Sequence, residues 1–311
     1  MAMPEIRENV PLATLTSWRV GGPARYFAEP TSVTEIQELL DWAQRESMPW
    51  LVIGKGSNLL IADTGFEGLV IRLGDKFGAV SVEDGLLRAQ AGCSTMNAIK
   101  AGAQAGWGGA EFLSSIPGTI GGTVYMNAGA HGGCVADVLV EATLLLPDGT
   151  IVVEPASALG FRYRYSNVRE RQAVVLEAVF RLQPKAGEDV QAEMKALSKW
   201  RRERQPQGLS AGSVFTNPPM ASAGKLIEDA GMKGETVGRA QISPVHANFI
   251  VNLGGATASD VNTLITRVQE RIFALHGFWL HAEVRGVGLS VGHPEAWRAP
   301  EATHDSAQAG A

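Results

Sequence analysis

The 311-residue chain has few cysteines, no long apolar run and no secretion signal. Its two cysteines, Cys93 and Cys134, lie far apart among small residues, which favours reduced thiols over a disulfide. No apolar stretch reaches the roughly 18 residues that a membrane span needs, and residues 1–7 have neither a basic nor an apolar signal region. We therefore expect a cytoplasmic protein that does not enter a membrane.

Clustered basic charge and metal-ligand spacing are also missing. The chain has 27 basic and 32 acidic residues, a net charge of -5, and no basic run longer than Arg201-Arg202. The sequence therefore lacks the cluster of basic residues that is typical of nucleic-acid-binding proteins. The six histidines have no metal-binding spacing, since His131 and Cys134 form a single isolated pair. We expect no nucleic-acid partner, no metal site and a monomeric chain.

Glycine, by contrast, is abundant and unevenly distributed. The chain has 36 glycines, and 19 of them lie between residues 51 and 150. Glycine is the residue that lets a backbone approach a ligand closely. The clustering therefore indicates a ligand site in the first half of the chain.

Hydrophobic periodicity and turn residues predict a mixed α and β chain. Strands are predicted at residues 50–53, 69–73, 79–82, 86–91, 138–146, 151–154, 173–182, 249–252 and 279–284. Helices are predicted after the cap Ser32, from Ser94 to Gly106, after the polar break at 185–188 as far as Pro206, and over 259–277. The segment 106–133 has no sustained period and is interpreted as a long functional loop, and 293–311 as a disordered tail.

Two glycine-rich segments suggest a phosphate-binding site. Residues 54–60 (GKGSNLL) follow a predicted strand and offer consecutive backbone N–H groups, which suit a phosphate. They form neither a Walker A loop nor a G-x-G-x-x-G fingerprint, because position 59 is Leu. The segment 117–133 is a second, unrelated glycine loop. Two such loops in one domain favour a long dinucleotide lying between them over two simple turns.

Three residues are candidates for reaction chemistry, and each has an ordinary alternative. Arg164 is flanked by tyrosines and could equally form a surface ion pair, while Ser213 in Ala-Gly-Ser-Val could be a turn or a helix cap. Glu283 could be a solvated strand residue. Strand alternation places it on the same face as Trp279 and His281.

Seven segments occur in order along the chain: GKGSNLL (54–60), IPGTIGGTVYMNAGAHGG (116–133), YRYS (163–166), AGSVFTNP (211–218), AGKLIEDAGMKG (223–234), HANFIVN (246–252) and HAEVRGVG (281–288). Together they resemble the UDP-N-acetylenolpyruvoylglucosamine reductases, FAD-dependent enzymes of bacterial peptidoglycan precursor synthesis. The resemblance implies an α+β fold with a two-part FAD-binding region of the vanillyl-alcohol-oxidase (PCMH) type at 1–185, divided between 78 and 79. A smaller α+β substrate-binding domain at 186–292 follows.

The resemblance also implies roles for individual residues. The expected FAD-binding residues are Gly54, Lys55, Gly56, Ser57, Asn58, Leu59, Pro117, Gly118, Thr119, Gly121 and Gly122, with Asn127 and Gly129 near the flavin. The catalytic positions match Arg164, Ser213 and Glu283. The expected substrate-binding residues are Asn217, Lys225, Lys233, His246 and Arg285.

The activity implied is reduction of UDP-N-acetylglucosamine enolpyruvate to UDP-N-acetylmuramate, by NADPH through non-covalently bound FAD. Hydride from the reduced flavin would reach the vinyl carbon, Arg164 would stabilise the enolate-like charge, and Ser213 would protonate the α-carbon. Glu283 would orient a group or take part in the protonation.

Two features refine the resemblance, and two alternatives remain. The short interval from Arg164 to Ser213 resembles the shorter, second type of the enzyme, which lacks a tyrosine-bearing loop. Thr216 stands where Lys is common, which leaves Arg201, Arg202 or Arg204 to meet the substrate diphosphate.

The alternatives are another FAD oxidoreductase of this fold, such as an alcohol or sugar oxidase, and a flavin-binding module without turnover.

Overall fold

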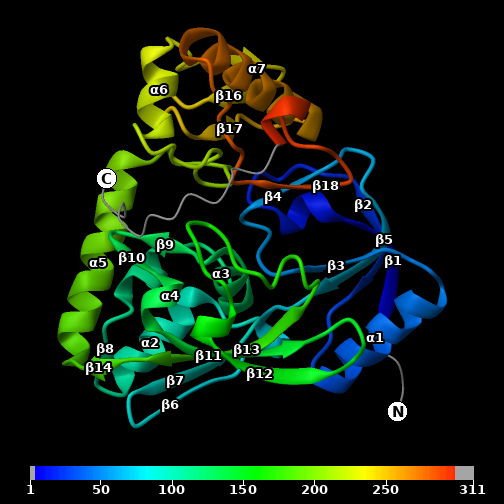
Figure 1. The fold of residues 1–311 in the computed structure, drawn as a ribbon, viewed down its shortest axis with the longest axis vertical. Helices are drawn as coiled ribbons and strands as arrows, with labels where there is room; N and C mark the ends of the chain where they lie inside the picture. Colours follow the sequence, from blue (N-terminus) through cyan, green and yellow to red (C-terminus); the bar gives the residue numbers. More distant parts are fainter. Residues whose placement is uncertain (1–3, 298–311) are drawn as a thin grey trace.

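The N-terminal part of the chain is built on a four-stranded sheet (Figure 1). The computed structural model describes residues 4–297. In this sheet the strand order is β1 (Ile6–Pro11), β2 (Pro23–Ala28), β5 (Phe66–Arg72), β3 (Trp50–Ile53). Strand β1 is antiparallel to β2, and β2, β5 and β3 are parallel to one another. Alternate residues of β5 face opposite cores: Leu69 packs with helix α1 (Val33–Arg45), and Val70 packs on the other face. The predicted cap Ser32 accepts a hydrogen bond from the Glu35 amide, so the first helix is confirmed.

A five-stranded antiparallel sheet forms the second subdomain. Its order is β12 (Ile151–Pro155), β11 (Leu139–Leu145), β13 (Val174–Arg181), β7 (Leu86–Gln90), β6 (Val80–Glu83), which confirms both predicted hairpins and the strand over 173–182. The helices around it are α2 (Thr95–Gln104), α3 (Ile120–Met126), α4 (Val135–Val138) and α5 (Gly187–Arg204). Short strand pairs are β8 (Trp107–Gly108) with β14 (Gln183–Pro184), and β9 (Gly129–Ala130) with β10 (Gly133–Cys134). Both cysteines are free, as predicted.

The prediction of one long loop over 106–133 is wrong, because this segment contains α3. Two adjacent glycines lower the helix propensity and interrupt the apolar pattern, so sequence periodicity missed the helix. The helix forms because it packs closely on the sheet: a Cβ at Gly121 would lie only 2.9 Å from Ala91 Cβ. Ile120 and Val124 of α3 are fully buried in the same core.

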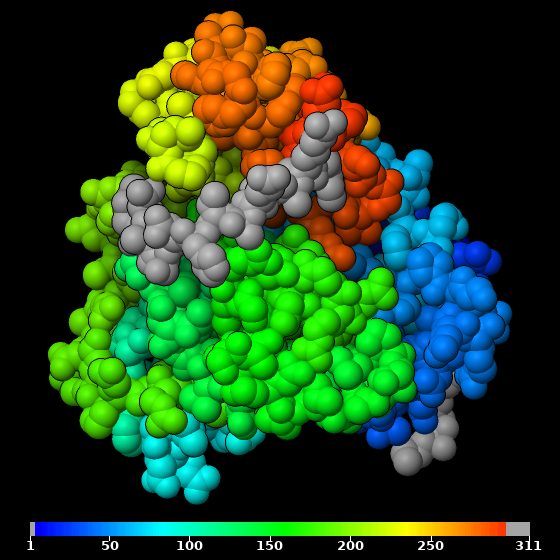
Figure 2. All heavy atoms as spheres, viewed as in Figure 1, coloured from blue at the N-terminus to red at the C-terminus, as the bar shows by residue number. Residues whose placement is uncertain are grey.

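The C-terminal part is smaller. It contains α6 (Ala223–Asp229), α7 (Ala258–His276) and a sheet of β15 (Thr236–Val237), β16 (Ala240–Ile242) and β17 (Ile250–Asn252). The predicted helix over 259–277 is confirmed, with Thr257 and Asp260 as a capping box and Gly277 in the left-handed region. Figure 2 shows this part as a separate lobe, yellow to orange, above the broad green surface of the second subdomain.

The strand predicted over 279–284 is wrong. This segment makes one isolated bridge, from Ala282 to Phe215, and the last strand is β18 (Arg285–Val287), parallel to β4 (Leu59–Ile61). Leu280 and Val284 are buried as a strand pattern requires, but within residues 4–297 the segment makes only two backbone hydrogen bonds, with Val214 and Thr216, and no continuous ladder. Gln269 of α7 also donates to the Leu280 carbonyl at 2.8 Å.

The N-terminal part reaches into the C-terminal core. Trp18 has no exposed surface and lies among C-terminal residues, with Leu60 of β4 beside it. Its indole N–H donates to the Ile250 carbonyl at 2.7 Å, and Asn252 Nδ2 donates to the Trp18 carbonyl. Asp63 accepts hydrogen bonds from the first amides of α7. These contacts join the two parts on one side.

Helix α5 runs along the molecule from β8 and β14 toward the C-terminal lobe (Figure 1). Its Val190 and Met194 belong to the core of the second subdomain, whereas the domain boundary at 185/186 stays a prediction. Residues 293–297 contain a short 3₁₀ turn with Ala296 buried, so the disorder expected from 293 onward is wrong for them; 298–311 lie outside the described residues. Over residues 4–297, no helix is long and apolar enough to cross a membrane.

Candidate active site

The first glycine loop, residues 54–58, leaves the end of β3 with its backbone amides free. Within residues 4–297, none of its N–H groups donates a hydrogen bond. Gly56 has φ +60°, and a Cβ there would lie 2.1 Å from the Leu15 carbonyl oxygen, so only glycine fits. The Lys55 side chain is exposed, and Leu59 begins β4. Consecutive free amides of this kind form an anion cradle.

The second glycine segment meets this loop just before α3. A Cβ on Gly54 would lie 2.3 Å from Thr119 Oγ1, and one on Gly118 would lie 3.8 Å from Ser57 Oγ. Pro117, directly before, is exposed. The two loops that were expected to share one ligand therefore lie side by side.

Only part of the second segment offers free amides. The amides of Ile120 and Gly121 donate to carbonyls between β7 and α2, each at 2.9 Å. Those of Gly118, Thr119 and Gly122 have no acceptor in the described part of the chain. These three amides and the first loop form a cradle that fits the diphosphate of a dinucleotide.

Asn127 and Gly129 occupy the other end of α3. Asn127 caps the helix with φ 42°, and its buried side chain donates to the Arg162 carbonyl at 3.0 Å and accepts from the Ala136 amide at 2.9 Å. Both ends of the Asn127 amide are thus bound within the protein. The Gly129 carbonyl accepts from Arg164 Nη2 at 3.0 Å.

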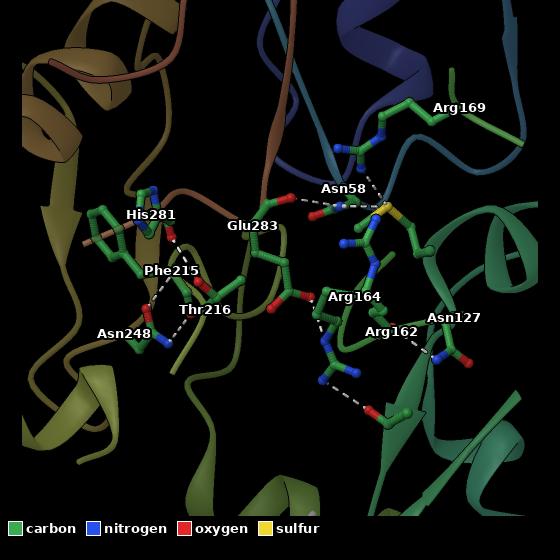
Figure 3. Close-up of polar contacts among 12 residues, drawn as sticks. Asn58, Asn127, Arg162, Arg164, Arg169, Phe215, Thr216, Asn248, His281 and Glu283 are labelled. Atoms are coloured by element: carbon green, nitrogen blue, oxygen red, sulfur yellow. Dashed lines mark hydrogen bonds and ion pairs between the residues drawn. The ribbon is translucent and has the colours of Figure 1, made fainter. Parts of the chain in front are cut away.

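Arg164 and Glu283, 119 positions apart in the sequence, form an ion pair (Figure 3). Arg164 Nε lies 3.0 Å from Glu283 Oε1, and the two side chains are 22% and 16% exposed. The Nε–H is not aligned with that oxygen, so this buried donor makes no hydrogen bond. Arg164 also has φ +56°, a conformation that costs energy for a non-glycine residue. Strain and an unsatisfied donor together are typical of a functional site.

The Glu283 carboxyl has a raised pKa. Burial is the main cause, and the charge of Arg164 opposes it without cancelling it. The ordinary alternative, a solvated carboxylate on a strand face, is therefore excluded. A buried carboxyl with one cationic partner can hold a proton or orient a polar group.

Ser213 lies near this pair along the backbone. The Glu283 amide donates to the carbonyl of Val214, the next residue, at 2.8 Å. Ser213 caps no helix, and its hydroxyl makes no hydrogen bond with the residues described. The hydroxyl is therefore free for a ligand, and its catalytic role stays a prediction.

Asn58 joins the glycine loop to the Glu283 segment. Its Nδ2 donates to the Glu283 carbonyl at 3.1 Å (Figure 3). Its own backbone carbonyl accepts from the Arg285 amide at 3.0 Å. Asn58 therefore connects the first glycine loop to the segment that carries Glu283.

The residues expected to bind substrate fall into two groups. The guanidinium of Arg285 lies over the Tyr125 ring of α3, 5.1 Å from its centroid, and donates a hydrogen bond to the Tyr125 hydroxyl. The other four lie on or beside α6, where they make local contacts. They are Asn217, which accepts from the Ala223 amide, Lys225 and Lys233, which pair with Asp229 and Glu228, and His246, whose Nδ1 accepts from the Asn248 amide. Burial and the charge of Lys233 lower the pKa of His246.

Tyr125 is a site residue that the sequence analysis missed. It lies on α3, its ring is flanked by Arg285 and by Arg169 at 5.5 Å, and its carbonyl accepts from Ser166 Oγ. The tyrosine between Val124 and Met126 carries no pattern of its own. Only the prediction of a helix over α3 would have pointed to Tyr125.

Comparisons with known proteins agree with this geometry. An FAD binding domain profile matches residues 24–153, and the profile of the UDP-N-acetylenolpyruvoylglucosamine reductase C-terminal domain matches 205–287. The reductase of Prochlorococcus marinus (strain MIT 9313) is 46% identical over 287 residues, covering 90% of this chain and 92% of that protein. The one from Bacillus velezensis is 40% identical over 286 residues, covering 91% and 94%.

Solved structures show the same relationship. The reductase from Thermus caldophilus superposes with a TM-score of 0.79 at 36% identity, covering 91% of this chain and all 100% of that one. The 6-hydroxy-D-nicotine oxidase from Arthrobacter nicotinovorans, at 17% identity and a TM-score of 0.50 over 59% of this chain and 43% of that one, shares the fold alone.

The fold and the double glycine cradle define an FAD-dependent oxidoreductase of the vanillyl-alcohol-oxidase fold type, which confirms the expected fold class and cofactor. Within that class, the chain belongs to the UDP-N-acetylenolpyruvoylglucosamine reductase family.

Proposed function

We propose that this chain reduces UDP-N-acetylglucosamine enolpyruvate to UDP-N-acetylmuramate in the bacterial cytoplasm, using NADPH and bound FAD. The observation that supports this most is the half-buried Arg164–Glu283 ion pair, which Asn58 connects to the loop of free backbone amides. Family membership supplies the substrate class. The cradle amides would hold the FAD diphosphate, and FAD when bound would relay hydride from NADPH to the substrate.

Arg164 has the properties of a charge-stabilising residue for this reaction. Hydride addition to the vinyl carbon leaves negative charge next to the substrate carboxylate. The Gly129 carbonyl holds Nη2 of the guanidinium and Glu283 flanks Nε, so the cation is oriented before the charge develops. A preorganised donor of this kind lowers the barrier more than one that must reorient.

Ser213 is the proposed proton donor to the α-carbon. A hydroxyl is a weak acid, but it suffices toward a carbanion and adds little bulk. Glu283 would orient the substrate carboxylate or assist the protonation, and its raised pKa is compatible with either role.

The FAD-loaded protein tests this proposal directly. NADPH should reduce the flavin, seen as bleaching of its visible absorbance, and the enolpyruvyl nucleotide should reoxidise it anaerobically with formation of UDP-N-acetylmuramate. An oxidase would instead use an alcohol or sugar as reductant and dioxygen as acceptor. Absence of nucleotide-dependent reoxidation in the wild-type protein would overturn the proposal.

Ser213→Ala tests the proton donor. We expect unchanged flavin reduction by NADPH and reoxidation by substrate slowed by about 10²–10⁴-fold, the usual range for general acid catalysis. Ser210→Ala, three residues earlier in the same segment, is the matched control. Equal reoxidation rates in both variants would remove Ser213 from this role.

A further inference from the structure

Gln269 of α7 is a buried side-chain amide that binds two other segments of the C-terminal part at once. Only 1% of its surface is exposed. Its Nε2 donates to the Leu280 carbonyl at 2.8 Å, and its Oε1 accepts from the His293 amide at 2.6 Å. An amide satisfies both partners, which neither a carboxylate nor an apolar side chain can do. Gln269 therefore joins the Glu283 segment (279–283) to the C-terminal segment (290–297).

The C-terminal segment lies along α7 (Figure 1). Asn262, about two helical turns before Gln269, donates to the Ser290 carbonyl at 3.1 Å and accepts from the Gly292 amide at 2.8 Å. Gly292 has φ +74°, and a Cβ there would lie 2.1 Å from Gln269 Oε1. Only glycine lets the chain approach Gln269 this closely.

Two further contacts join the C-terminal segment to the Glu283 segment. His281 Nδ1 bonds the Ala296 carbonyl oxygen at 2.9 Å. The Trp279 ring stacks on the His293 ring with 4.3 Å between centroids. The Glu283 segment is thus held along one edge by a buried amide, an imidazole and a ring stack.

The other edge of the Glu283 segment faces the Ser213 segment (213–216). The His281 carbonyl accepts from the Thr216 amide at 3.0 Å, and the two residues lie together in Figure 3. The Glu283 amide donates to the Val214 carbonyl at 2.8 Å. The Glu283 segment therefore lies between the Ser213 segment and the contacts that Gln269 organises.

We propose that Gln269 is a positioning residue for the Glu283 carboxyl. By clamping the Glu283 segment against the Ser213 segment, it fixes where that carboxyl lies relative to Arg164. The Gln269 side chain makes no hydrogen bond to the ion pair or to the glycine loops within the described chain, so it acts through the clamped segment alone. This inference rests on the proposed function, which gives Glu283 its part in the reaction.

Gln269→Leu and Gly292→Ala test the clamp in the FAD-loaded protein. The first removes both hydrogen bonds, and the second pushes the C-terminal segment away from Gln269. We expect unchanged flavin reduction by NADPH, and a kcat and a rate of reoxidation by substrate that fall by about 3- to 10-fold, the value of one or two hydrogen bonds. KM should change less than kcat. Gln191→Leu, the same substitution at an exposed helix position, is the control and should match wild type.

A double-mutant cycle separates positioning from general structural damage. In a Glu283→Ala background, adding Gln269→Leu should slow reoxidation no further, because the clamp acts through that carboxyl. Multiplying losses in the double variant would overturn the inference.

Hydrogen exchange in the FAD-free protein tests the clamp without any nucleotide. The amides of Thr216 and Glu283 should exchange about 3- to 10-fold faster in Gln269→Leu and Gly292→Ala, with those of β13 unchanged. Unchanged exchange in both folded variants would overturn the inference, as would faster exchange with unchanged reoxidation. Wild-type protein that cannot turn over substrate contradicts the proposed function instead, and the exchange rates still show whether Gln269 holds the Glu283 segment.

Discussion

At the scale of single residues, the raised pKa of Glu283 links the active site to folding stability. A carboxyl whose pKa is higher in the folded than in the unfolded chain binds more protons when folded. The stability that this proton contributes is complete below the unfolded pKa, about 4.3 for Glu, and is lost as pH rises through the folded value. The buried carboxylate is thus a destabilising group at neutral pH.

Glu283→Gln should therefore change the pH dependence of stability. The amide resembles the protonated carboxyl, so the variant should gain melting temperature relative to wild type as pH rises from about 4.3 toward neutrality. Thermal scans of both proteins over that range measure the difference, with the exposed Glu46→Gln as control. A constant difference across pH would contradict the burial argument.

Residue types in motifs predicted part of the site from sequence alone. Arg164 and Glu283 were candidates before their contact was known, and the structure brings them together. Tyr125 could not be found in this way, because its contacts with Arg285 and Arg169 depend on how α3 packs against distant segments.

At the scale of elements, the paired glycines of α3 separate packing from ligand binding. A Cβ at Gly121 would collide with Ala91, whereas one at Gly122 has Thr119 Oγ1 as nearest neighbour at 3.8 Å. The first faces the sheet, and the second, with a free amide, faces the proposed cradle. Adjacent positions on one helix thus serve different purposes.

We expect Gly121→Ala to destabilise the FAD-free protein by about 1–3 kcal/mol, the usual cost of overpacking. Gly122→Ala should leave stability equal or higher, since Ala is the better helix former by about 1 kcal/mol, yet weaken FAD binding. Urea unfolding of the apoprotein and FAD titration measure the two effects. The reverse pattern, with FAD affinity lost only in Gly121→Ala, would place the cradle on the other side of α3.

Elements with strong local signals were predicted well, and those that depend on tertiary contacts were not. Ser32 and Thr257 announce helices through capping, a local interaction. Helix α3 and the segment before β18 follow from distant partners, Ala91 for the helix and Gln269 for the segment. Local propensity carries no information on such partners.

At the scale of the whole molecule, Trp18 of the N-terminal part is buried in the core of the C-terminal part and so joins the two. Trp18→Ala should lower the free energy of unfolding by about 3–5 kcal/mol, the usual cost of a large buried side chain. The C-terminal part should be affected most, because the indole lies in its core and bonds to Ile250.

Hydrogen exchange distinguishes this local effect from general destabilisation. In Trp18→Ala, amides of α7 should exchange faster than those of β13, and Trp18→Phe should restore most of the protection. Uniformly faster exchange in both elements would show that Trp18 does not act as a joint between the parts.

The parallel pairing of β18 with β4 has a consequence for biosynthesis. β4 follows directly on the first glycine loop, yet its ladder partner β18 is synthesised more than 220 residues later. A growing or prematurely terminated chain has both glycine loops but lacks the strand that anchors the first. Stable cofactor uptake is therefore expected only after β18 has been synthesised, so a chain truncated before residue 285 should not retain flavin.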